Sequence, residues 1–208
     1  MPAGSLAAVL EALRAGKAAV IPTDTVYGLA ISPLHAASPS MLNELKGRPS
    51  DKPVAWLLAD GEGLDVYGED VPDAAQVLAR AFWPGALTLV VRASDAVPAA
   101  FASSQGTIGL RVPDDVLTRS LAAELGCPLA VTSANLSGRP APYRFRDIDE
   151  ALLSQVVVAI DDDREKSGIA STVVDCTSGA FRIVREGAIT ESEISAVLEA
   201  AGVWAPRL

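Results

Sequence analysis

The sequence predicts a single α/β domain, and three features of the 208-residue chain support this fold class. Short apolar runs typical of buried strands alternate with amphipathic stretches typical of helices along the chain. Half of the residues are apolar and 21% are charged, which is usual for a globular protein. Chains of this length routinely form one domain and can bury a full hydrophobic core.

Six amphipathic segments are predicted to be helices, because they carry apolar stripes at helical spacing and capping residues at their ends. They cover residues 5–15, 38–46, 72–81, 114–125, 147–154 and 190–200. The predicted N-terminal caps include Ser5, Asp114 or Asp115, Asp147 and a capping box from Thr190 to Glu193. Gly16 and Gly126 are placed to end the first and fourth helices.

Eight short apolar segments are predicted to be strands, at residues 18–21, 54–58, 86–91, 107–113, 128–131, 156–160, 171–175 and 181–185. Residues 59–71 are rich in Gly and Asp, and residues 93–105 are small and polar. Both segments are therefore predicted to be loops. Ser178-Gly179 is predicted to join the last two strands in a turn.

The composition argues against several classes of protein. A formal net charge of −9 at pH 7 disfavours broad, non-specific binding of nucleic acid, although it allows a local basic patch. No apolar run approaches the roughly 20 residues that span a bilayer, and the N-terminus lacks the pattern of a signal peptide. Cys127 and Cys176 have no metal-binding spacing, so we expect two buried free thiols in a reducing cytoplasm.

The loop from Lys46 to Pro53 concentrates positive charge in an acidic protein. Lys46, Arg48 and Lys52, less the one charge of Asp51, give it a local net charge of +2. Gly47 and two prolines exclude a regular helix or strand there. Cations presented from a bent backbone between two regular elements suit an anionic ligand such as phosphate. The alternative is a solvated turn with scattered charge.

Two further polar groups follow predicted buried strands. Thr23, Asp24, Thr25 and Tyr27 come after the strand at 18–21, where open α/β sheets collect ligands. The segment from Thr132 to Gly138 follows the strand at 128–131 and offers hydroxyls and an amide to phosphate or sugar oxygens. These residue types also favour caps and turns, so a purely structural role is the alternative for both groups, with Tyr27 in the core.

A run of three aspartates, Asp161 to Asp163, raises the alternative of a metal site. Arg164 and Lys166 follow directly, and the spacing is not that of a calcium-binding loop, so we do not assign one. A second basic cluster consists of Arg139, Arg144 and Arg146.

Taken in order, these motifs resemble those of the YrdC-like family of threonylcarbamoyl-AMP synthases. The resemblance covers the chain from about Ser5 to Ala200, and six motifs in this order are highly specific. They are Pro22-Thr23-Asp24-Thr25-Val26-Tyr27-Gly28-Leu29, Lys46-Gly47-Arg48, Thr107 to Arg111, Ser133-Ala134-Asn135-Leu136-Ser137-Gly138, Ser171-Thr172-Val173-Val174-Asp175 and the strand arginine Arg185. One departure is Ala141, where many members carry a serine, and the missing hydroxyl would remove one phosphate contact.

The resemblance implies a large twisted mixed β-sheet, flanked by helices around a concave basic cavity. It places one YrdC-like domain at residues 5–201, with tails at 1–4 and 202–208, as in the short single-domain members. It also implies an enzyme that joins L-threonine, bicarbonate and ATP into threonylcarbamoyl-AMP and releases pyrophosphate. That product serves threonylcarbamoyladenosine modification of tRNA, so tRNA and other threonylcarbamoyl-transfer proteins are expected partners.

Residue roles follow from the matched motifs and from the charge of the substrates. The expected ATP-binding residues are Lys46, Arg48, Lys52, Thr107, Ser133, Asn135, Ser137 and Arg185, of which Lys46 and Arg48 are also the catalytic candidates. The expected threonine-binding residues are Thr23, Tyr27, Arg111 and Ser171. Arg111 suits the carboxylate because a guanidinium can donate two parallel hydrogen bonds. No residue is expected to hold a resident metal, and Mg²⁺ is expected to shield the departing pyrophosphate.

Two other functions are compatible with the same sequence. The chain could be an RNA-binding module that contacts backbone phosphates through Lys46, Arg48, Arg144 and Arg146. It could also be a paralogue with another carbamoyl chemistry, as in hydrogenase-maturation carbamoyltransferases. The nearly complete motifs favour ATP and threonine, and the acidic composition disfavours a pure RNA binder.

Overall fold

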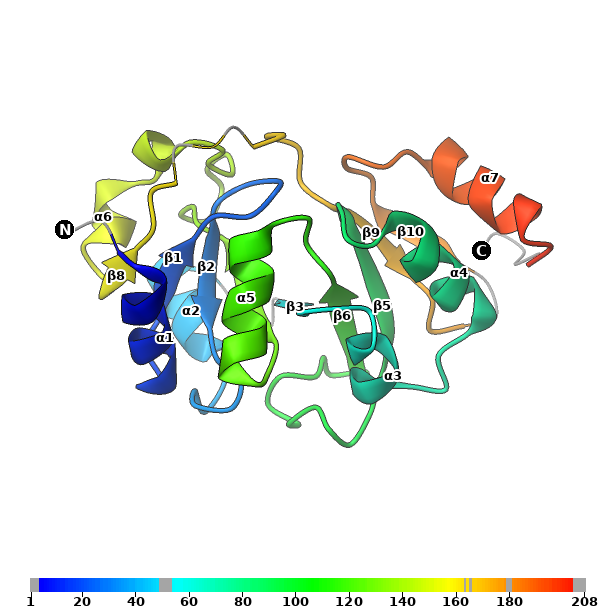
Figure 1. Cartoon of the computed structure of the whole chain (residues 1–208), viewed down its shortest axis with the longest axis horizontal. Coiled ribbons are helices and arrows are strands. Elements are labelled where there is room, and N and C mark those ends of the chain that lie inside the picture. The colour runs from blue at the N-terminus through cyan, green and yellow to red at the C-terminus, as the bar shows by residue number, and fades with distance from the viewer. Residues whose placement is uncertain (1–3, 49–53, 163, 165, 179–180, 204–208) are drawn as a thin grey trace.

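The computed structural model describes residues 4–48, 54–162, 164, 166–178 and 181–203. Within these ranges a ten-stranded mixed sheet runs through the molecule and carries helices on both sides (Figure 1). Its strands are β1 (Ala19–Ile21), β2 (Gly28–Ile31), β3 (Ala55–Leu57), β4 (Gly68–Glu69), β5 (Leu87–Ala93), β6 (Thr107–Arg111), β7 (Leu129–Ser133), β8 (Val158–Ala159), β9 (Thr172–Asp175) and β10 (Arg182–Arg185). The α/β class and the large mixed sheet are confirmed.

The helices begin and end close to the predicted positions. They are α1 (Leu6–Arg14), α2 (Ser40–Lys46), α3 (Gly63–Tyr67), α4 (Asp73–Phe82), α5 (Val116–Leu125), α6 (Glu150–Leu153) and α7 (Glu191–Ala200), with a 3-10 turn at Phe145–Asp147. The predicted caps Ser5, Asp115 and Thr190 each accept a hydrogen bond from the first helical turn. The predicted cap Asp147 is wrong, because it lies in the 3-10 turn and the Asp149 side chain caps α6 instead.

The order of strands across the sheet is β10-β9-β5-β6-β3-β7-β2-β1-β8, and β4 pairs with β5 beside this path. Three neighbouring pairs are parallel: β1 with β8, β3 with β6 and β5 with β9. The other pairs are antiparallel. Strands from the two ends of the chain, β1 and β10, therefore lie far apart in a sheet whose middle is built from β6, β3 and β7.

The sequence missed three elements. The segment from Gly28 to Ile31 was expected as the end of a polar loop, but it forms the buried strand β2, antiparallel to β1. The predicted loop 59–71 contains α3 and β4, because its apolar residues pack beneath Trp56 and against β5. The predicted strand 156–160 is reduced to Val158–Ala159.

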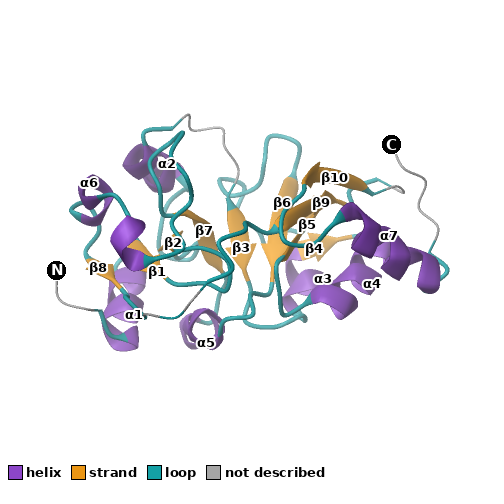
Figure 2. Cartoon of the chain, turned by 90° about the horizontal axis from the view of Figure 1, so that it is seen from above, coloured by secondary structure: helices purple, strands orange, loops and turns teal. Residues whose placement is uncertain are grey.

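Alternating side chains divide the sheet into two faces. On one face, Leu29, Trp56 and Leu110 pack with residues of α2, α3, α4, α6 and α7 in the larger hydrophobic cluster. On the other face, Ala30 and Leu129 pack with α1 and α5 in the smaller one. Figure 2 shows α1 and α5 beside the half of the sheet that holds β1, β2 and β7, and α3, α4 and α7 beside the other half.

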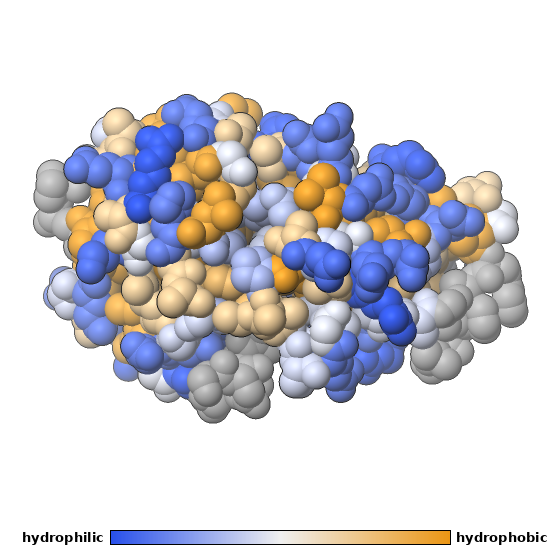
Figure 3. All heavy atoms as spheres, turned by 90° about the horizontal axis from the view of Figure 1, so that it is seen from below, coloured by the Kyte–Doolittle hydropathy of each residue, from blue (hydrophilic) through white to orange (hydrophobic). Residues whose placement is uncertain are grey.

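The surface is mixed in character. In the view of Figure 3, hydrophobic residues form several small patches that hydrophilic residues separate. Among the described helices, none is long and apolar enough to cross a membrane. Cys127 and Cys176 are both buried free thiols, as predicted.

Candidate active site

Helices α1 and α5 cover one face of the sheet only in part, and on this face the region around β6 remains uncovered. In β6, alternation places Thr107, Gly109 and Arg111 on this face. Gly109 pairs with Ala55 of β3 on one side and with Val90 of β5 on the other. Thr107, Gly109, Ala55 and Val90 are partly exposed, whereas their neighbours along each strand are buried. We call the surface formed by these four residues and Arg111 the open face.

Arg111 lies at the end of β6, and its guanidinium has three different partners. Nε donates to the Gly85 carbonyl at 2.8 Å, Nη1 to the Thr25 hydroxyl at 3.1 Å and Nη2 to the Asp24 carboxylate at 2.6 Å. The residue is only 5% exposed. Burial lowers the pKa of Arg111, and the negative charge of Asp24 opposes that shift. A guanidinium held this firmly is already oriented for a carboxylate or phosphate that reaches its remaining N–H groups.

The loop that follows β1 supplies two of these partners and is folded around Thr23. The Thr23 hydroxyl donates to the Val26 carbonyl at 2.7 Å and accepts from the backbone N–H groups of Thr25 and Val26. Its hydroxyl therefore closes the turn in this structure, which is the structural alternative that the sequence left open. The turn presents Asp24 and Thr25 toward Arg111.

Tyr27 is the last residue of this loop, and it is buried rather than exposed at the open face. The side chain is 1% exposed, and its hydroxyl donates to Asp162 at 2.9 Å. Its ring packs edge-on against Phe145, with the Lys166 ammonium 4.6 Å from the ring centroid. Burial and the neighbouring Asp162 carboxylate raise the pKa of Tyr27. Tyr27 thus supports the loop from behind in this structure.

Lys46, at the end of α2, is buried against the turn that follows β7. Its Nζ donates to the carbonyl of Asn135 at 2.5 Å, to the Asn135 side-chain oxygen at 3.1 Å and to the Ser133 carbonyl. Burial and the positive charge of Arg48 lower the pKa of Lys46 to about 8. Arg48 donates from Nε to Asn43 at 2.6 Å. Lys46, Arg48 and the Ser133–Asn135 turn therefore form one cationic group.

The same group lies at the border of the open face. Val131 pairs with Ala55, so Ser133, two residues further along β7, points to the side of the sheet that holds Thr107. Ser137, in the turn after β7, donates its backbone N–H to the Lys46 carbonyl at 2.9 Å, and its side chain is exposed. The Thr107 hydroxyl is within 2.7 Å of the Ser103 hydroxyl.

A third group comes from β5, β9 and β10. The pairing of Leu89 with Leu110 places Thr88 beside Arg111, and the Thr88 hydroxyl lies 2.9 Å from that of Ser171. Arg185 donates from Nη2 to the Ser171 carbonyl at 2.7 Å and to its hydroxyl at 3.2 Å. Burial lowers the pKa of Arg185. Ser171 thus lies between two of the arginines that the sequence assigned to different substrates.

The structure therefore brings most of the predicted residues to one region. Lys52 lies outside the described residues, so its predicted role is not assessed. The predicted roles of Thr23, Tyr27, Lys46, Arg48, Thr107, Arg111, Ser133, Asn135, Ser137, Ser171 and Arg185 stay predictions. A concave cavity also stays a prediction, and the surface hollow lined by Leu58, Tyr67 and Cys127 contains none of the candidate residues.

Sequence reasoning assigned no individual substrate-binding role to four residues that have direct contacts in this region. Asp24 and Thr25 belong to the quoted motif, and Thr88 is the polar residue of an apolar strand, so each had a local signal. Lys166 had none, because its contact with Tyr27 joins residues far apart in sequence. Within the aspartate run, Asp162 accepts hydrogen bonds from both Arg164 and Lys166, and no metal role is assigned to the run.

The fold and the open face define an α/β protein whose sheet carries three groups of cationic side chains around one uncovered region. The chain belongs to the Sua5/YciO/YrdC family, described as telomere recombination, whose model matches residues 11–187. This assignment confirms the family that the motifs predicted.

Three relatives illustrate the likeness. A threonylcarbamoyl-AMP synthase of Pyrococcus abyssi is 34% identical over 186 residues, which are 89% of this chain and 55% of that protein. A mouse threonylcarbamoyl-AMP synthase is 33% identical over 206 residues, 96% of this chain and 72% of that protein. The structure of P. abyssi Sua5 complexed with L-threonine superimposes with a TM-score of 0.87 at 33% identity, covering 93% of this chain and 57% of that one. This chain thus spans about half the length of the P. abyssi relative.

Proposed function

We propose that this protein joins L-threonine, bicarbonate and ATP into threonylcarbamoyl-AMP, with release of pyrophosphate, for threonylcarbamoyladenosine modification of tRNA. The single observation that carries this proposal is the convergence of Arg111, the Ser171–Arg185 pair and the Lys46–Ser133–Asn135 group around one open face. The threonylcarbamoyl-AMP synthases among the relatives and the threonine-bound Sua5 structure support the choice of substrates.

The reaction needs two anions to meet. The threonine amine and bicarbonate form a carbamate and water, and a carbamate oxygen then attacks the α-phosphorus of ATP while pyrophosphate leaves. The carbamate and the phosphates repel each other, so the site must neutralise charge and hold the partners in line. No covalent enzyme intermediate is required for this sequence of steps.

The candidate residues divide between the two substrates. Arg111 would hold the threonine carboxylate, with Thr23 and Tyr27 shaping the loop beside it and Ser171 contributing a hydroxyl. The ATP phosphates and ribose would contact Lys46, Arg48, Lys52, Thr107, Ser133, Asn135, Ser137 and Arg185. Because Ser171 contacts Arg185, the two substrate positions would adjoin there.

Mg²⁺ is proposed to arrive with ATP rather than to reside in the protein. The described residues contain no group of three His, Cys, Asp or Glu that could hold a metal ion. The site groups named above are cationic or neutral apart from Asp24, which is paired with Arg111, and Mg²⁺ typically keeps several waters and binds through substrate phosphates. Supplied together with ATP, it would neutralise charge on the departing pyrophosphate.

The test is incubation of the protein with Mg-ATP, bicarbonate and L-threonine, followed by measurement of pyrophosphate. We expect pyrophosphate release that depends on both threonine and bicarbonate. Release without threonine would favour another carbamoyl chemistry. Tight binding of tRNA without any release would favour the RNA-binding module, for which exposed Arg144, stacked 4.8 Å from the Tyr143 ring centroid, is a candidate contact.

The biological setting is also a proposal. The two buried free thiols are compatible with a reducing cytoplasm, where tRNA is modified. There the product would pass to proteins that transfer the threonylcarbamoyl group to tRNA. We propose that residues 5–201 form the catalytic domain.

A further inference from the structure

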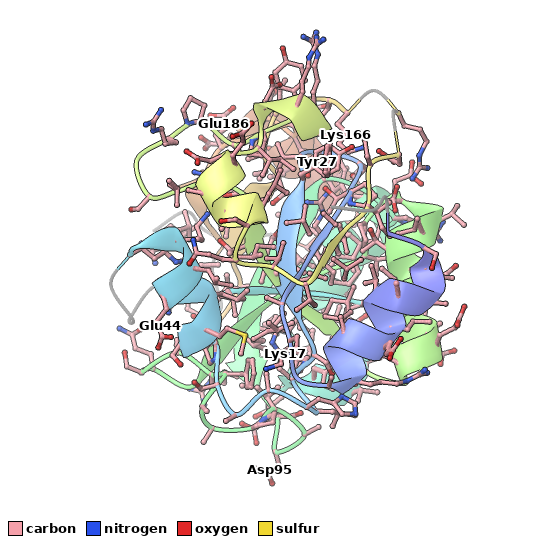
Figure 4. All side chains as sticks on the ribbon, turned by 90° about the vertical axis from the view of Figure 1, so that its left-hand side faces the viewer. Lys17, Tyr27, Glu44, Asp95, Lys166 and Glu186 are labelled. Carbon is pink, nitrogen blue, oxygen red and sulfur yellow. The ribbon has the colours of Figure 1, made fainter. Side chains whose placement is uncertain are left out.

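A buried cluster of charges lies behind the loop that faces Arg111. The Asp162 carboxylate accepts from the Tyr27 hydroxyl at 2.9 Å, from Arg164 Nε at 2.7 Å and from Lys166 Nζ at 2.8 Å. Figure 4 shows Lys166 and Tyr27 close together at one end of the molecule. We call these four residues the Asp162 cluster.

The cluster holds Tyr27 in two directions. Asp162 accepts from the hydroxyl at the edge of the ring, and the Lys166 ammonium lies 4.6 Å from the ring centroid, at the distance of a cation–π contact. Phe145 packs edge-on against the same ring. The Tyr27 side chain therefore has little freedom to move relative to Asp162 and Lys166.

The backbone after Lys166 is also hydrogen-bonded to the loop that contains Asp24 and Thr25. The N–H of Ser167 donates to the Asp24 carbonyl at 3.2 Å, and the N–H of Gly168 donates to the Thr25 carbonyl at 3.0 Å. Both of these backbone hydrogen bonds thus go to Asp24 and Thr25, the residues whose side chains hold Arg111. A displacement of Lys166 would be passed through Asp24 and Thr25 to the guanidinium.

The cluster is also anchored to a regular element. Arg164 Nη2 donates to Asp115 at 2.7 Å, and the Asp115 side chain caps α5 by accepting from the Thr118 backbone at 2.8 Å. Through Asp115, the loop before β2 and the segment after β8 are thereby attached to the N-terminal end of α5. Three separate parts of the chain meet at this point.

Stability alone is a weak explanation for such a cluster. The side chain of Lys166 is only 2% exposed and that of Asp162 is 8% exposed. Removing two charges from water is costly, and well-packed apolar residues of similar volume often stabilise a protein as well or better. The buried Lys166–Asp162 pair is better explained if it fixes the geometry of the neighbouring loop that contains Asp24 and Thr25.

We infer that Lys166, acting through Asp162 and Tyr27, is a positioning residue for the threonine subsite, which rests on the proposed function. It touches no substrate. It fixes the loop so that Asp24 and Thr25 hold Arg111 in the orientation that receives the amino-acid carboxylate. The ATP groups at Lys46 and Arg48 have no described contact with the cluster, so they should be insensitive to it.

The central experiment compares wild type with Lys166→Met, which keeps the length of the side chain but removes its charge. We expect the KM for threonine to rise about tenfold or more, because a small misplacement of a binding group is costly. The KM for ATP should stay within about twofold, since uniform loss of structure would raise both. Lys166→Arg should restore much of the threonine affinity because it keeps the charge.

Two further variants keep the test decisive if Lys166→Met folds poorly. Arg164 is 53% exposed, so Arg164→Gln should fold, and it should raise the threonine KM in the same direction by a smaller factor. Arg182→Gln is the matched control, because it removes an exposed ion pair to Asp175 at 2.9 Å that is not part of the Asp162 cluster. It should leave the KM for threonine unchanged.

Calorimetric titration of L-threonine into each protein separates this inference from the proposed function. Wild type that binds threonine without releasing pyrophosphate would refute the synthase, while weaker binding by Lys166→Met would still support positioning. Threonine affinity equal to wild type in both Lys166→Met and Arg164→Gln would overturn the inference. An equal rise of the ATP and threonine KM values would also overturn it, because the cluster would then be merely structural.

Discussion

The ATP affinity of this protein should depend on pH through Lys46. Its ammonium is 4% exposed, and burial together with the charge of Arg48 lowers its pKa to about 8 from an ordinary 10.5. If Lys46 binds a phosphate, only the charged form contributes fully. ATP should therefore bind less tightly as the pH rises through 8, and binding at that pH should be accompanied by proton uptake.

The size of the effect follows from the fraction of charged lysine. With a pKa of about 8, Lys46 is almost fully charged at pH 7, half charged at pH 8 and about one-tenth charged at pH 9. The dissociation constant for ATP should therefore rise by up to about tenfold between pH 7 and pH 9, equivalent to roughly 1.4 kcal/mol. ATP phosphates are already ionised in this range, since the last phosphate pKa is about 6.

The same shift predicts the sign of a stability change. Between pH 8 and 10.5 the unfolded chain binds the Lys46 proton more tightly than the folded chain does. The free energy of unfolding should consequently rise with pH in this window as far as Lys46 is concerned. The penalty for burying the charge is fully present below pH 8 and is relieved as the pH rises.

The measurement is calorimetric titration of Mg-ATP into wild type, Lys46→Met and Lys17→Met at several pH values between 7 and 9.5. Lys17 is an exposed lysine between α1 and β1, outside the candidate site, so its variant should behave like wild type. Lys46→Met should bind weakly, with no dependence on pH from this residue. A flat wild-type profile, or equal slopes in wild type and Lys46→Met, would remove Lys46 from the phosphate site.

Three further predictions concern other parts of the molecule. Wild type should use threonine best, then serine, and valine least, as measured by amino-acid-dependent pyrophosphate release. Arg111→Lys should weaken the use of all three amino acids alike. Equal use of valine and threonine by wild type would contradict the threonine site. Replacing the exposed Arg144 and Arg146 by Ala should flatten the salt dependence of any tRNA binding, and an unchanged slope would make them ordinary surface charge. Gly187→Ala should lower Tm in a thermal melt, because its Cβ would lie 2.1 Å from the Ala170 carbonyl oxygen; an unchanged Tm would mean that the loop moves freely.

Capping residues and apolar spacing predicted a helix correctly where both lie within one short segment of the sequence. Ser5 and Thr190 cap the helices that their spacing indicated, and the Thr190–Glu193 capping box is present in full. β2 was missed because a strand of four residues follows six residues of polar and turn-forming character. Periodicity cannot identify so short a strand, and its burial depends on pairing with β1 and β7.

The candidate site shows a different limit. The motifs identified the residues Arg111 and Ser171, but not that Thr88 and Arg185 would join them. That contact depends on β5 lying between β6 and β9, an order set by long-range strand pairing. The motif also predicted Tyr27 as a threonine-binding residue, and this role stays a prediction. The position of Tyr27 behind the loop depends on Lys166, which lies 139 residues away in sequence.

The placement of charge would allow an acidic protein to handle the two anionic substrates proposed above. Three cations of the site, Lys46, Arg111 and Arg185, have pKa values lowered by burial, which means that each is held partly out of water at a cost. Of these three, Arg111 alone has a carboxylate partner among the described residues, Asp24 at 2.6 Å. Lys46 and Arg185 are held by carbonyl, amide or hydroxyl oxygens, which orient a cation without cancelling its charge. An arriving phosphate therefore gains more from them than from a surface ion pair, and the net charge of −9 can repel other polyanions elsewhere on the surface.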